Sequence, residues 1–574
     1  TGTLADTGGA GTDTSTGTDS ATGNTDSSDA TETGETDATE ATDTSDATET
    51  GETDTGSGTF CQPGTLSCAD LSTPQRCADN GSAWEAQTAC TGDERCSSGR
   101  CLIACPNDPK FGVFVGCEYW ATDLPNYPDP FLSPTPEDLP WALVVSNPRS
   151  VATTVGFEMP ANVSYSPADP VIPPKSSRVF EMPSLNVQGT SLRPKGVHVV
   201  ATGPILVHQF NPWDSRFSND ASVLLPDPIL GTEYFVLTWP TSPFETIQLP
   251  GFPPPPPNQN GYFTVIGAFD NTEVVFQVTG RVVASGPIPD MQAGSIFVTT
   301  INRGDVLSIQ ADPSSIFTAA TEGDLTGSRV TSNKPVAVFA GHEEAVIGMP
   351  EPDPFPTDPS EDDGNCCADH LEEQMLPTSL LTGNYIAVKS PLRGPANNPE
   401  VDYWRIQAVE ENVTINTNPP QPGANGVTLA RRGDWVEIQS KVSFEINATG
   451  RVQVGQYLVS QQVTEDVTGD PSLTLAVPQE RFRKDYAFAV PDQGYDALYV
   501  SFVKRVGETV TIDDVAVPQG IFSTVGSGGW EAGFVSISPG VHIASGQARF
   551  GLYVYGYSNA VSFGYIGGLA LPGE

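Results

Sequence analysis

The chain has 574 residues, a formal net charge of −43 and a hydrophobic content of 38%. A surface this acidic repels nucleic acid and anionic lipid, so we exclude both as partners. Apolar runs are far shorter than the roughly 20 residues of a membrane-spanning helix, so any membrane attachment is expected through an N-terminal lipid anchor. The chain begins at Thr1 without a methionine or a signal peptide, and we therefore expect a processed product, such as a lipoprotein anchored to the outer membrane.

Residues 1–58 consist almost entirely of Thr, Ser, Gly, Ala, Asp and Glu, with fourteen acidic residues and no Lys or Arg. Such a segment has too little apolar surface to offset the entropy of ordering the chain. It is predicted to be a disordered acidic stalk that holds the folded part away from a surface. The alternative interpretation is an inert solubilising tail.

Residues 59–104 form a small cysteine-rich module with few large apolar side chains, so its stability must come from disulfides. Zinc is disfavoured because the spacing lacks C-x₂-C pairs and no histidine is nearby. Six cysteines allow fifteen pairings, and the sequence leaves all of them open. The six are Cys61, Cys68, Cys77, Cys90, Cys96 and Cys101.

Residues 105–574 are predicted to be all-β, because apolar and polar residues alternate in short segments that end at Gly, Pro, Asn or Asp. Three landmarks recur four times in the same order, which predicts four repeats. The first landmark is an acid or amide followed by tyrosine: Glu118-Tyr119, Glu233-Tyr234, Asn384-Tyr385 and Asp485-Tyr486. The second is an aromatic strand leading through a turn into a β-branched strand. The third is a short apolar strand after Gly or Pro, at 203–210, 334–341, 450–457 and 540–548.

The predicted repeats are 117–230, 231–381, 382–482 and 483–574. Each is long enough for six or seven strands, so the fold is either four sandwich-like modules or a closed propeller-like ring. We expect hydroxyl or charged side chains such as Thr238 and Lys389 to lie on the solvent faces of these strands.

Residues 333–388 contain a connection whose sequence does not recur, with the doublet Cys366-Cys367 and the histidines His342 and His370. These four side chains could bind zinc or iron, but oxidation to a disulfide with hydrogen-bonded histidines is favoured. For the remaining cysteines we favour disulfides from Cys117, and from Cys105, to the doublet. Such bonds would link the start of the β region to its middle. A local Cys105–Cys117 bond is the alternative, whereas a vicinal bond would be strained.

The carboxylates of the acidic loop 351–365 could bind calcium, but we interpret this loop as solvated. Its carboxylates are Glu351, Asp353, Asp358, Glu361, Asp362 and Asp363. No EF-hand pattern is present, so no cofactor is predicted.

Catalysis has little support, because the chain lacks the G-x-S-x-G, H-E-x-x-H and phosphate-loop motifs. His198, His208 and His542 are interpreted as core or surface residues, and the pair Asp513-Asp514 is only a weak glycosidase candidate. The alternating Tyr553, Tyr555 and Tyr557 point to one side of a strand, and we favour a core position for them over a binding platform.

Several segments resemble the IgGFc-binding protein N-terminal domain family, over roughly residues 110–572. They are SNKPVAVFAGHE at 332–343, CADHLEEQMLP at 367–377, DLTGSRVTS at 324–332, TGDPSLTL at 468–475 and GCEYWATDLPN at 116–126. The resemblance implies family-motif positions at Asp369, His370, Glu372 and Gln374, and an extracellular binding or adhesion module. Gly469-Asp470-Pro471-Ser472 lacks the histidine of the related Gly-Asp-Pro-His element, so self-cleavage is not expected.

The sequence thus predicts a non-enzymatic, extracellular or cell-surface adhesion protein that binds another extracellular protein or a glycoconjugate. The alternative is a secreted hydrolase that acts on glycan or peptide with carboxylates on a β scaffold, Asp369 and Glu372 being the residues to test.

Overall fold

The computed structural model describes residues 61–571, apart from short gaps in 62–113 and the segments 130–131, 215–217, 243–256, 349–367, 465–467 and 493. The predicted stalk, the acidic loop and the doublet Cys366-Cys367 lie outside the described residues. What is described is all-β, as predicted, with one helix of four residues, α1 (Ala319–Glu322), and a few 3-10 turns. None of the described helices is long and apolar enough to cross a membrane.

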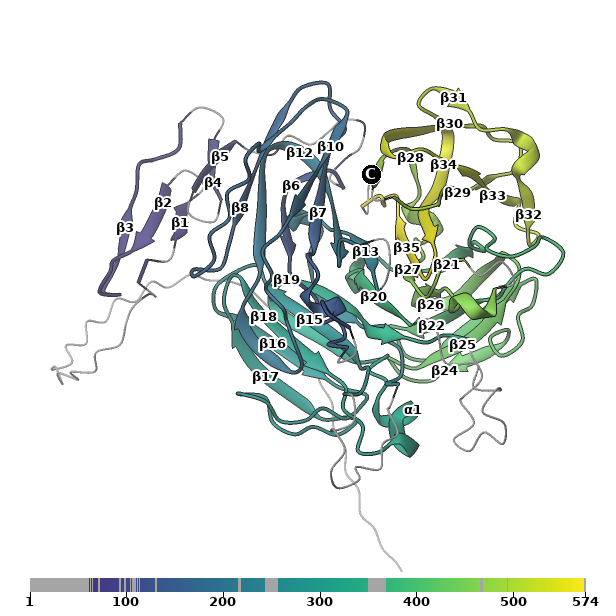
Figure 1. Cartoon of the computed structure of the whole chain (residues 1–574), viewed down its shortest axis with the longest axis horizontal. Helices are drawn as coiled ribbons and strands as arrows, with labels where there is room; N and C mark the ends of the chain where they lie inside the picture. Colours follow the sequence, from purple (N-terminus) through teal and green to yellow (C-terminus); the bar gives the residue numbers. More distant parts are fainter. Residues whose placement is uncertain are drawn as a thin grey trace, which may run out of the picture. The chain divides into compact units, whose positions relative to one another are not determined.

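Four curled antiparallel sheets follow one another along the chain, which confirms the four predicted repeats (Figure 1). Sheet 1 has β6 (Gly116–Ala121), β7 (Ala142–Asn147), β8 (Thr153–Glu158), β9 (Val171–Ile172), β10 (Ser176–Glu181), β12 (Val197–Asn211) and β13 (Asp220–Val223). Sheet 2 has β11 (Ser191–Pro194), β14 (Gly231–Phe235), β15 (Gly261–Gly267), β16 (Thr272–Gln277), β17 (Ile296–Ile301), β18 (Asp305–Gln310), β19 (Arg329–Ala345) and β20 (Asp369–Gln374).

The second half of the chain repeats this plan. Sheet 3 has β21 (Thr382–Ala387), β22 (Asp402–Ala408), β23 (Val413–Asn418), β24 (Val427–Leu429), β25 (Trp435–Ser440), β26 (Phe444–Tyr457) and β27 (Leu473–Leu475). Sheet 4 has β28 (Arg483–Val490), β29 (Ala497–Arg505), β30 (Val510–Ile512), β31 (Val515–Ala516), β32 (Ser523–Val525), β33 (Trp530–Ser536), β34 (Gly540–Ser558) and β35 (Val561–Ile566).

Each sheet is built on one long strand, which we call the hub strand: β12, β19, β26 and β34, with 14 to 19 residues each. The first half of a hub strand pairs with the strand that carries the tyrosine landmark (β6, β14, β21 or β28) and with one other strand. Its second half pairs with two different strands, of which one is the last strand of the sheet. A hub strand therefore belongs to two half-sheets at once, which curls the sheet.

The predicted tyrosine landmark holds the bend of each hub strand. The hydroxyl of Tyr234 accepts a hydrogen bond from the Gly231 amide and donates one to the Val336 carbonyl, at 2.7 Å each. Tyr119, Tyr385 and Tyr486 donate in the same way to Ile205, Val452 and Phe550. The pairing register shifts next to each of these acceptors, so the tyrosine satisfies backbone groups that the irregular ladder leaves open.

This equivalence corrects one predicted landmark. The third landmark falls in the second half of the hub strand in sheets 1 to 3, but residues 540–548 form the first half of β34. The position equivalent to Ile205, Val336 and Val452 is Phe550. The pattern was misplaced because both halves of β34 follow a glycine and carry apolar residues.

The expected solvent positions of Thr238 and Lys389 are also wrong. Thr238 is fully buried, and its hydroxyl donates to Asp324 Oδ1 at 2.9 Å. The side chain of Lys389 is only 9% exposed and pairs with Asp402 at 2.8 Å and Glu400 at 3.0 Å. Both side chains find polar partners at depth, which periodicity alone does not reveal.

In the cysteine-rich module, β1 (Leu66–Asp70), β2 (Thr73–Cys77) and β3 (Trp84–Ala86) form one small sheet, and β4 (Glu94–Ser97) and β5 (Arg100–Ile103) form another. Cys61 is bonded to Cys77, and Cys90 and Cys96 are also disulfide-bonded. The favoured link from Cys105 and Cys117 to the doublet is wrong, because Cys105 and Cys117 are bonded to each other. Their Cα atoms are 5.7 Å apart, and a separation of 12 residues closes a loop at a lower entropic cost than about 250 would.

We predict that Tyr234→Phe lowers the free energy of unfolding by about 1–3 kcal/mol, because it leaves a buried amide and a buried carbonyl without their partner. The measurement is urea denaturation of the full chain. Tyr499→Phe is the matched control, since the described residues offer no hydrogen bond to that half-buried hydroxyl. An equal loss in both variants would show that the Tyr234 hydroxyl does not support the bend.

Candidate functional site

The four family-motif residues predicted from the sequence lie on β20, the last strand of sheet 2. Asp369, His370, Glu372 and Gln374 are all at most 2% exposed. The strand itself recurs, because β13, β27 and β35 occupy the same place in the other sheets. The sequence predicted that the connection at 333–388 occurs once. This is correct for its residue types, but the strand that it contains has an equivalent in each of the four sheets.

These four last strands, which we call the inner strands, meet at the centre of the described region (Figure 1). In the order β13, β20, β27, β35 each contacts the next, and β35 also contacts β13. Each inner strand pairs with its own hub strand on one side only, so its other edge presents backbone amides to a neighbouring sheet. Buried amides of this kind need acceptors.

Side-chain oxygens from the neighbouring sheets supply those acceptors. Asp220 of sheet 1 accepts hydrogen bonds from the amide of Glu372 in sheet 2 at 3.2 Å and from the amide of Leu473 in sheet 3 at 2.9 Å. Asp369 accepts from the amide of Ser562 in sheet 4 at 3.2 Å. Glu373 and Gln374 accept likewise from the amides of Leu475 and Leu225, at 3.2 and 2.7 Å. The motif therefore binds the four sheets to one another.

Burial keeps most of these carboxyl groups protonated near neutral pH. Desolvation raises the pKa of Glu372 to about 8, although hydrogen bonds from Gln209 and Ser222 oppose the shift. Desolvation also raises the pKa values of Asp220 and Asp369 well above their usual range, and the nearby Asp470 adds to the effect on Asp369. The buried acids are thus hydrogen-bonding groups that are largely uncharged.

The two histidines of the predicted metal set are also buried. Desolvation lowers the pKa of His342 and of His370 to about 3, so both are neutral. His342 Nε2 lies 3.1 Å from the Pro240 carbonyl, and His370 Nε2 lies 3.3 Å from the Tyr262 hydroxyl. Hydrogen-bonded histidines were the favoured interpretation, and the geometry confirms that part of it. The cysteines of the set and the calcium loop lie outside the described residues.

The other side chains singled out in the sequence have structural roles. Tyr553, Tyr555 and Tyr557 are at most 3% exposed, which confirms the core interpretation, and the Tyr555 hydroxyl donates to Gln456 Oε1 of sheet 3 at 2.8 Å. Asp513 lies in an exposed turn, where its carboxylate is 2.7 Å from His542 Nδ1. His198, His208 and His542 are buried, as expected for core residues.

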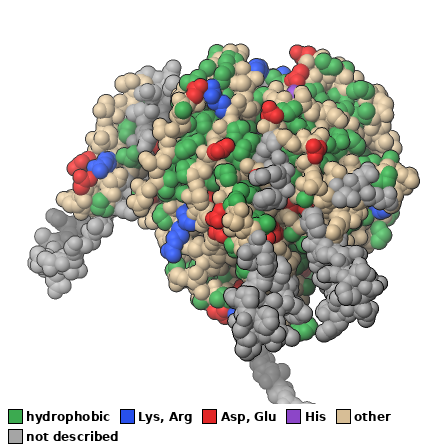
Figure 2. All heavy atoms as spheres, viewed as in Figure 1, with side chains coloured by type: hydrophobic (Ala, Val, Ile, Leu, Met, Phe, Trp, Pro, Cys, Tyr) green, Lys and Arg blue, Asp and Glu red, His purple; other side chains and the backbone are tan. Residues whose placement is uncertain are grey.

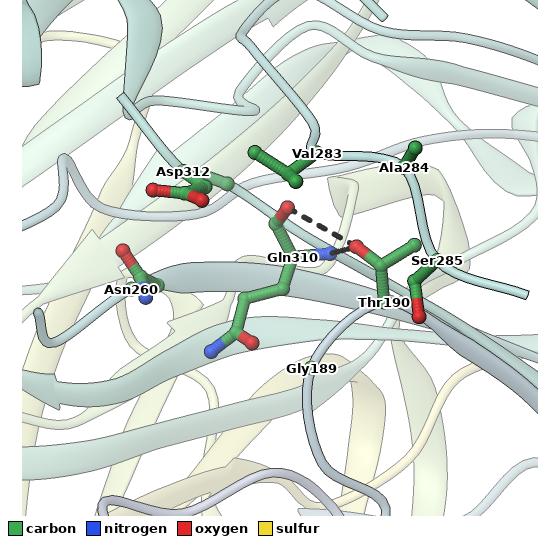
Figure 3. Close-up of a pocket in the computed structure, with 9 residues that line it drawn as sticks. Gly189, Thr190, Asn260, Val283, Ala284, Ser285, Gln310 and Asp312 are labelled. Atoms are coloured by element: carbon green, nitrogen blue, oxygen red, sulfur yellow. Dashed lines mark hydrogen bonds between the residues drawn. The ribbon is translucent and has the colours of Figure 1, made fainter. Parts of the chain in front are cut away.

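A small pocket of about 220 Å³, with both apolar and polar walls, opens on sheet 2 (Figure 3). Its walls come from the loop before β11, the hairpin after β16 and the residues that follow β18. The polar groups at the pocket belong to Thr190, Asn260, Ser285, Gln310 and Asp312. The Thr190 hydroxyl bonds to the backbone of Gln310 at 3.2 and 3.4 Å, which fixes the lip of the pocket. Hydroxyl, amide and carboxylate groups of this kind suit a ligand group rich in hydroxyls.

Sequence reasoning missed several partners of the motif. Asp220 sits in a short polar segment that has no distinguishing pattern, and Glu373 belongs to the quoted motif without having been singled out. Asp470 and Ser562 close the contact with sheet 4, where the Asp470 amide donates to the Ser562 hydroxyl at 2.7 Å. Asp470 lies in the quoted segment TGDPSLTL, which was the only signal for this group.

These features define a class of all-β protein in which four hub-strand sheets meet at a buried polar centre. A family model described as IgGFc binding protein matches residues 220–556, more than half of the chain, and the chain belongs to that family. The match begins at Asp220, the acid that joins three sheets. The human IgGFc-binding protein is 24% identical over 350 residues, which are 60% of this chain and 6% of the human protein. The chain therefore spans a small part of that relative.

We predict that the free energy of unfolding falls as the pH rises from about 4.5 to 8. The native chain keeps protons on Glu343, Glu344 and Glu372 up to a pKa of about 8, whereas unfolded glutamates release them near 4.5. The native state then binds more protons, so raising the pH favours unfolding.

Glu372→Gln should flatten this slope by up to about 1.4 kcal/mol per pH unit, the value for one proton. Denaturant titrations of both proteins between pH 4.5 and 8.5 provide the measurement. Glu273→Gln on the exposed face of β16 is the control and should leave the slope unchanged. A wild-type stability that rises over this pH range would contradict the assignment.

Proposed function

We propose that this protein is a non-enzymatic binding module that works outside the cell or on its surface and recognises a glycoconjugate or glycoprotein. The observation that supports the proposal is the burial of the family-motif acids. Asp369 and Glu372 are fully buried, and their oxygens accept hydrogen bonds from neighbouring sheets. Carboxyl groups engaged in this way hold the scaffold together and have no access to a substrate, so recognition is assigned to the outer surface.

The face shown in Figure 2 suits a hydroxyl-rich ligand. On the face shown in Figure 2, Asp and Glu side chains occur in small groups among hydrophobic and uncharged ones. The pocket on sheet 2 has the size of about one sugar residue and offers Ser285 and Asp312 as polar groups. The name of the human relative states that it binds the Fc part of immunoglobulin G, and this fragment belongs in the ligand panel. The extracellular location agrees with the disulfides of the described residues.

The test is binding of the full chain to a glycan array, a purified mucin-type glycoprotein and an immunoglobulin Fc fragment. We expect saturable binding to a glycan-bearing ligand without turnover, and Asp312→Asn should weaken it by about tenfold, since one hydrogen bond to a charged group contributes about 1.5 kcal/mol or more. Asp290→Asn, in the hairpin beside the pocket, is the control. Hydrolysis of any glycan or peptide in a parallel panel would favour the hydrolase alternative instead. Failure to bind any glycan-bearing ligand would overturn the proposal.

A further inference from the structure

Sheet 1 contains a second group of titratable side chains, remote in the sequence from the family motif. Glu118 on β6, His198 on β12 and Asp227 at the start of the 3-10 turn η2 (Asp227–Ile229) each bring one ligand atom within 4.8 Å of the others. His198 Nε2 lies 3.2 Å from Glu118 Oε2. On the other side of the ring, His198 Nδ1 lies 3.1 Å from Glu158 Oε2. The imidazole is stacked on Trp120 at 4.5 Å, which fixes its plane.

The equivalent place in sheet 2 has a different chemistry. Trp120 faces His198 across β6 and β12 in the same register in which Phe235 faces Arg329 across β14 and β19. There the guanidinium of Arg329 pairs with Glu233, and Thr378, which begins the turn η4 (Thr378–Leu380), donates its hydroxyl to Glu233 at 3.0 Å. In sheet 2 the Glu233 carboxylate is thus neutralised by a permanent cation and accepts a hydrogen bond from a hydroxyl group.

Sheet 1 has neither of these groups. His198 replaces the arginine and Asp227 replaces the threonine, so an acid faces the acid Glu118 where sheet 2 has a donor. Asp227 Oδ1 and His198 Nε2 are both buried without a well-formed hydrogen bond, and the nearest acid of the group to Nε2 is Glu118, whose oxygen lies at 3.2 Å. Two acceptor atoms buried within 4.8 Å of each other and of the Glu118 carboxylate are costly unless a cation lies between them.

We propose that Glu118, His198 and Asp227 form a binding site for a divalent transition metal ion, with zinc the best match to one imidazole nitrogen and two carboxylate oxygens. Donor atoms in a tetrahedral zinc shell lie roughly 3.4 Å apart for bonds of about 2.0–2.2 Å. The Glu118–His198 pair already has this spacing, and Asp227 closes the shell by a shift of no more than about 1.4 Å, given the 4.8 Å limit.

The surroundings fit such an ion. The Glu158 carboxylate lies next to Nδ1, where a carboxylate commonly accepts a hydrogen bond from a metal-binding histidine and orients its ring. Arg303 from sheet 2 donates to the same Glu158 oxygen at 2.7 Å and lies 2.6 Å from Nδ1, so it must move away from the ring when metal binding at Nε2 places the proton on Nδ1. A dication balances the three carboxylates together with Arg303. The Glu118 side chain is 20% exposed, which gives a water molecule access to the fourth position.

The experiment is titration of the full chain, first stripped with a chelator, with Zn²⁺ by calorimetry and with Co²⁺ by visible absorption. We expect one equivalent of Zn²⁺ to bind and Co²⁺ to develop the absorption of a four-coordinate site. His198→Gln should abolish this spectrum, and Glu158→Gln should weaken Zn²⁺ binding by about 10–100-fold. His542→Gln is the control, because that imidazole is held by the single carboxylate of Asp513.

A double variant guards against loss of folding. His198→Arg with Asp227→Thr copies the pair found in sheet 2, so it should fold with a melting temperature at least as high as that of the metal-free wild type and bind no Zn²⁺ at this site. Absence of Zn²⁺ and Co²⁺ binding in the wild type would overturn the proposal. The same holds if the double variant retains the Co²⁺ spectrum, since the metal would then be bound elsewhere.

Discussion

The described structure depends on how four sheet edges are satisfied where they meet. An inner strand that pairs on one side only leaves a row of backbone amides without a partner, and burying such an edge costs several kilocalories per mole unless acceptors are supplied. Here the acceptors are carboxyl and amide side chains of the next sheet. Asp220 alone receives amides from two other sheets. The acid-rich motif on β20 is therefore a requirement of the architecture, and its conspicuous residue types do not need a ligand to explain them.

The same constraint explains why so many acids are tolerated in the core. A carboxyl group that keeps its proton can accept from one amide and donate to another group without the cost of burying a charge. The chain separates the two roles of its acids: those of the inner strands are buried and largely protonated, whereas those at exposed turns, such as Asp513, carry surface charge. Arg405 shows the opposite solution, since its buried guanidinium is neutralised by Asp324 and Glu437 and links sheet 3 to sheet 2.

Sequence reasoning predicted the β class, the four repeats and the tyrosine landmark because all three leave local periodic signals. Tyr119, Tyr234, Tyr385 and Tyr486 recur at equivalent positions since each performs the same local task. The misplaced landmark at 540–548 and the wrong cysteine pairing have another cause: two halves of one hub strand look alike, and a disulfide partner is not written into local spacing. The burial of Thr238 and the role of Asp220 depend on neighbours more than eighty residues away, which a short window of sequence does not contain.

The contact between β35 and β13 determines when, during synthesis, the buried centre of the four sheets can form. Among the four inner strands, β35 (ending at residue 566) is synthesised last, whereas its neighbour β13 in sheet 1 is made more than three hundred residues earlier. Until β35 arrives, Asp369 lacks the Ser562 amide and the apolar side of β13 remains uncovered. A chain that stops before β35 would thus expose surface that chaperones and proteases recognise, and the arrival of β35 would itself serve as the quality check.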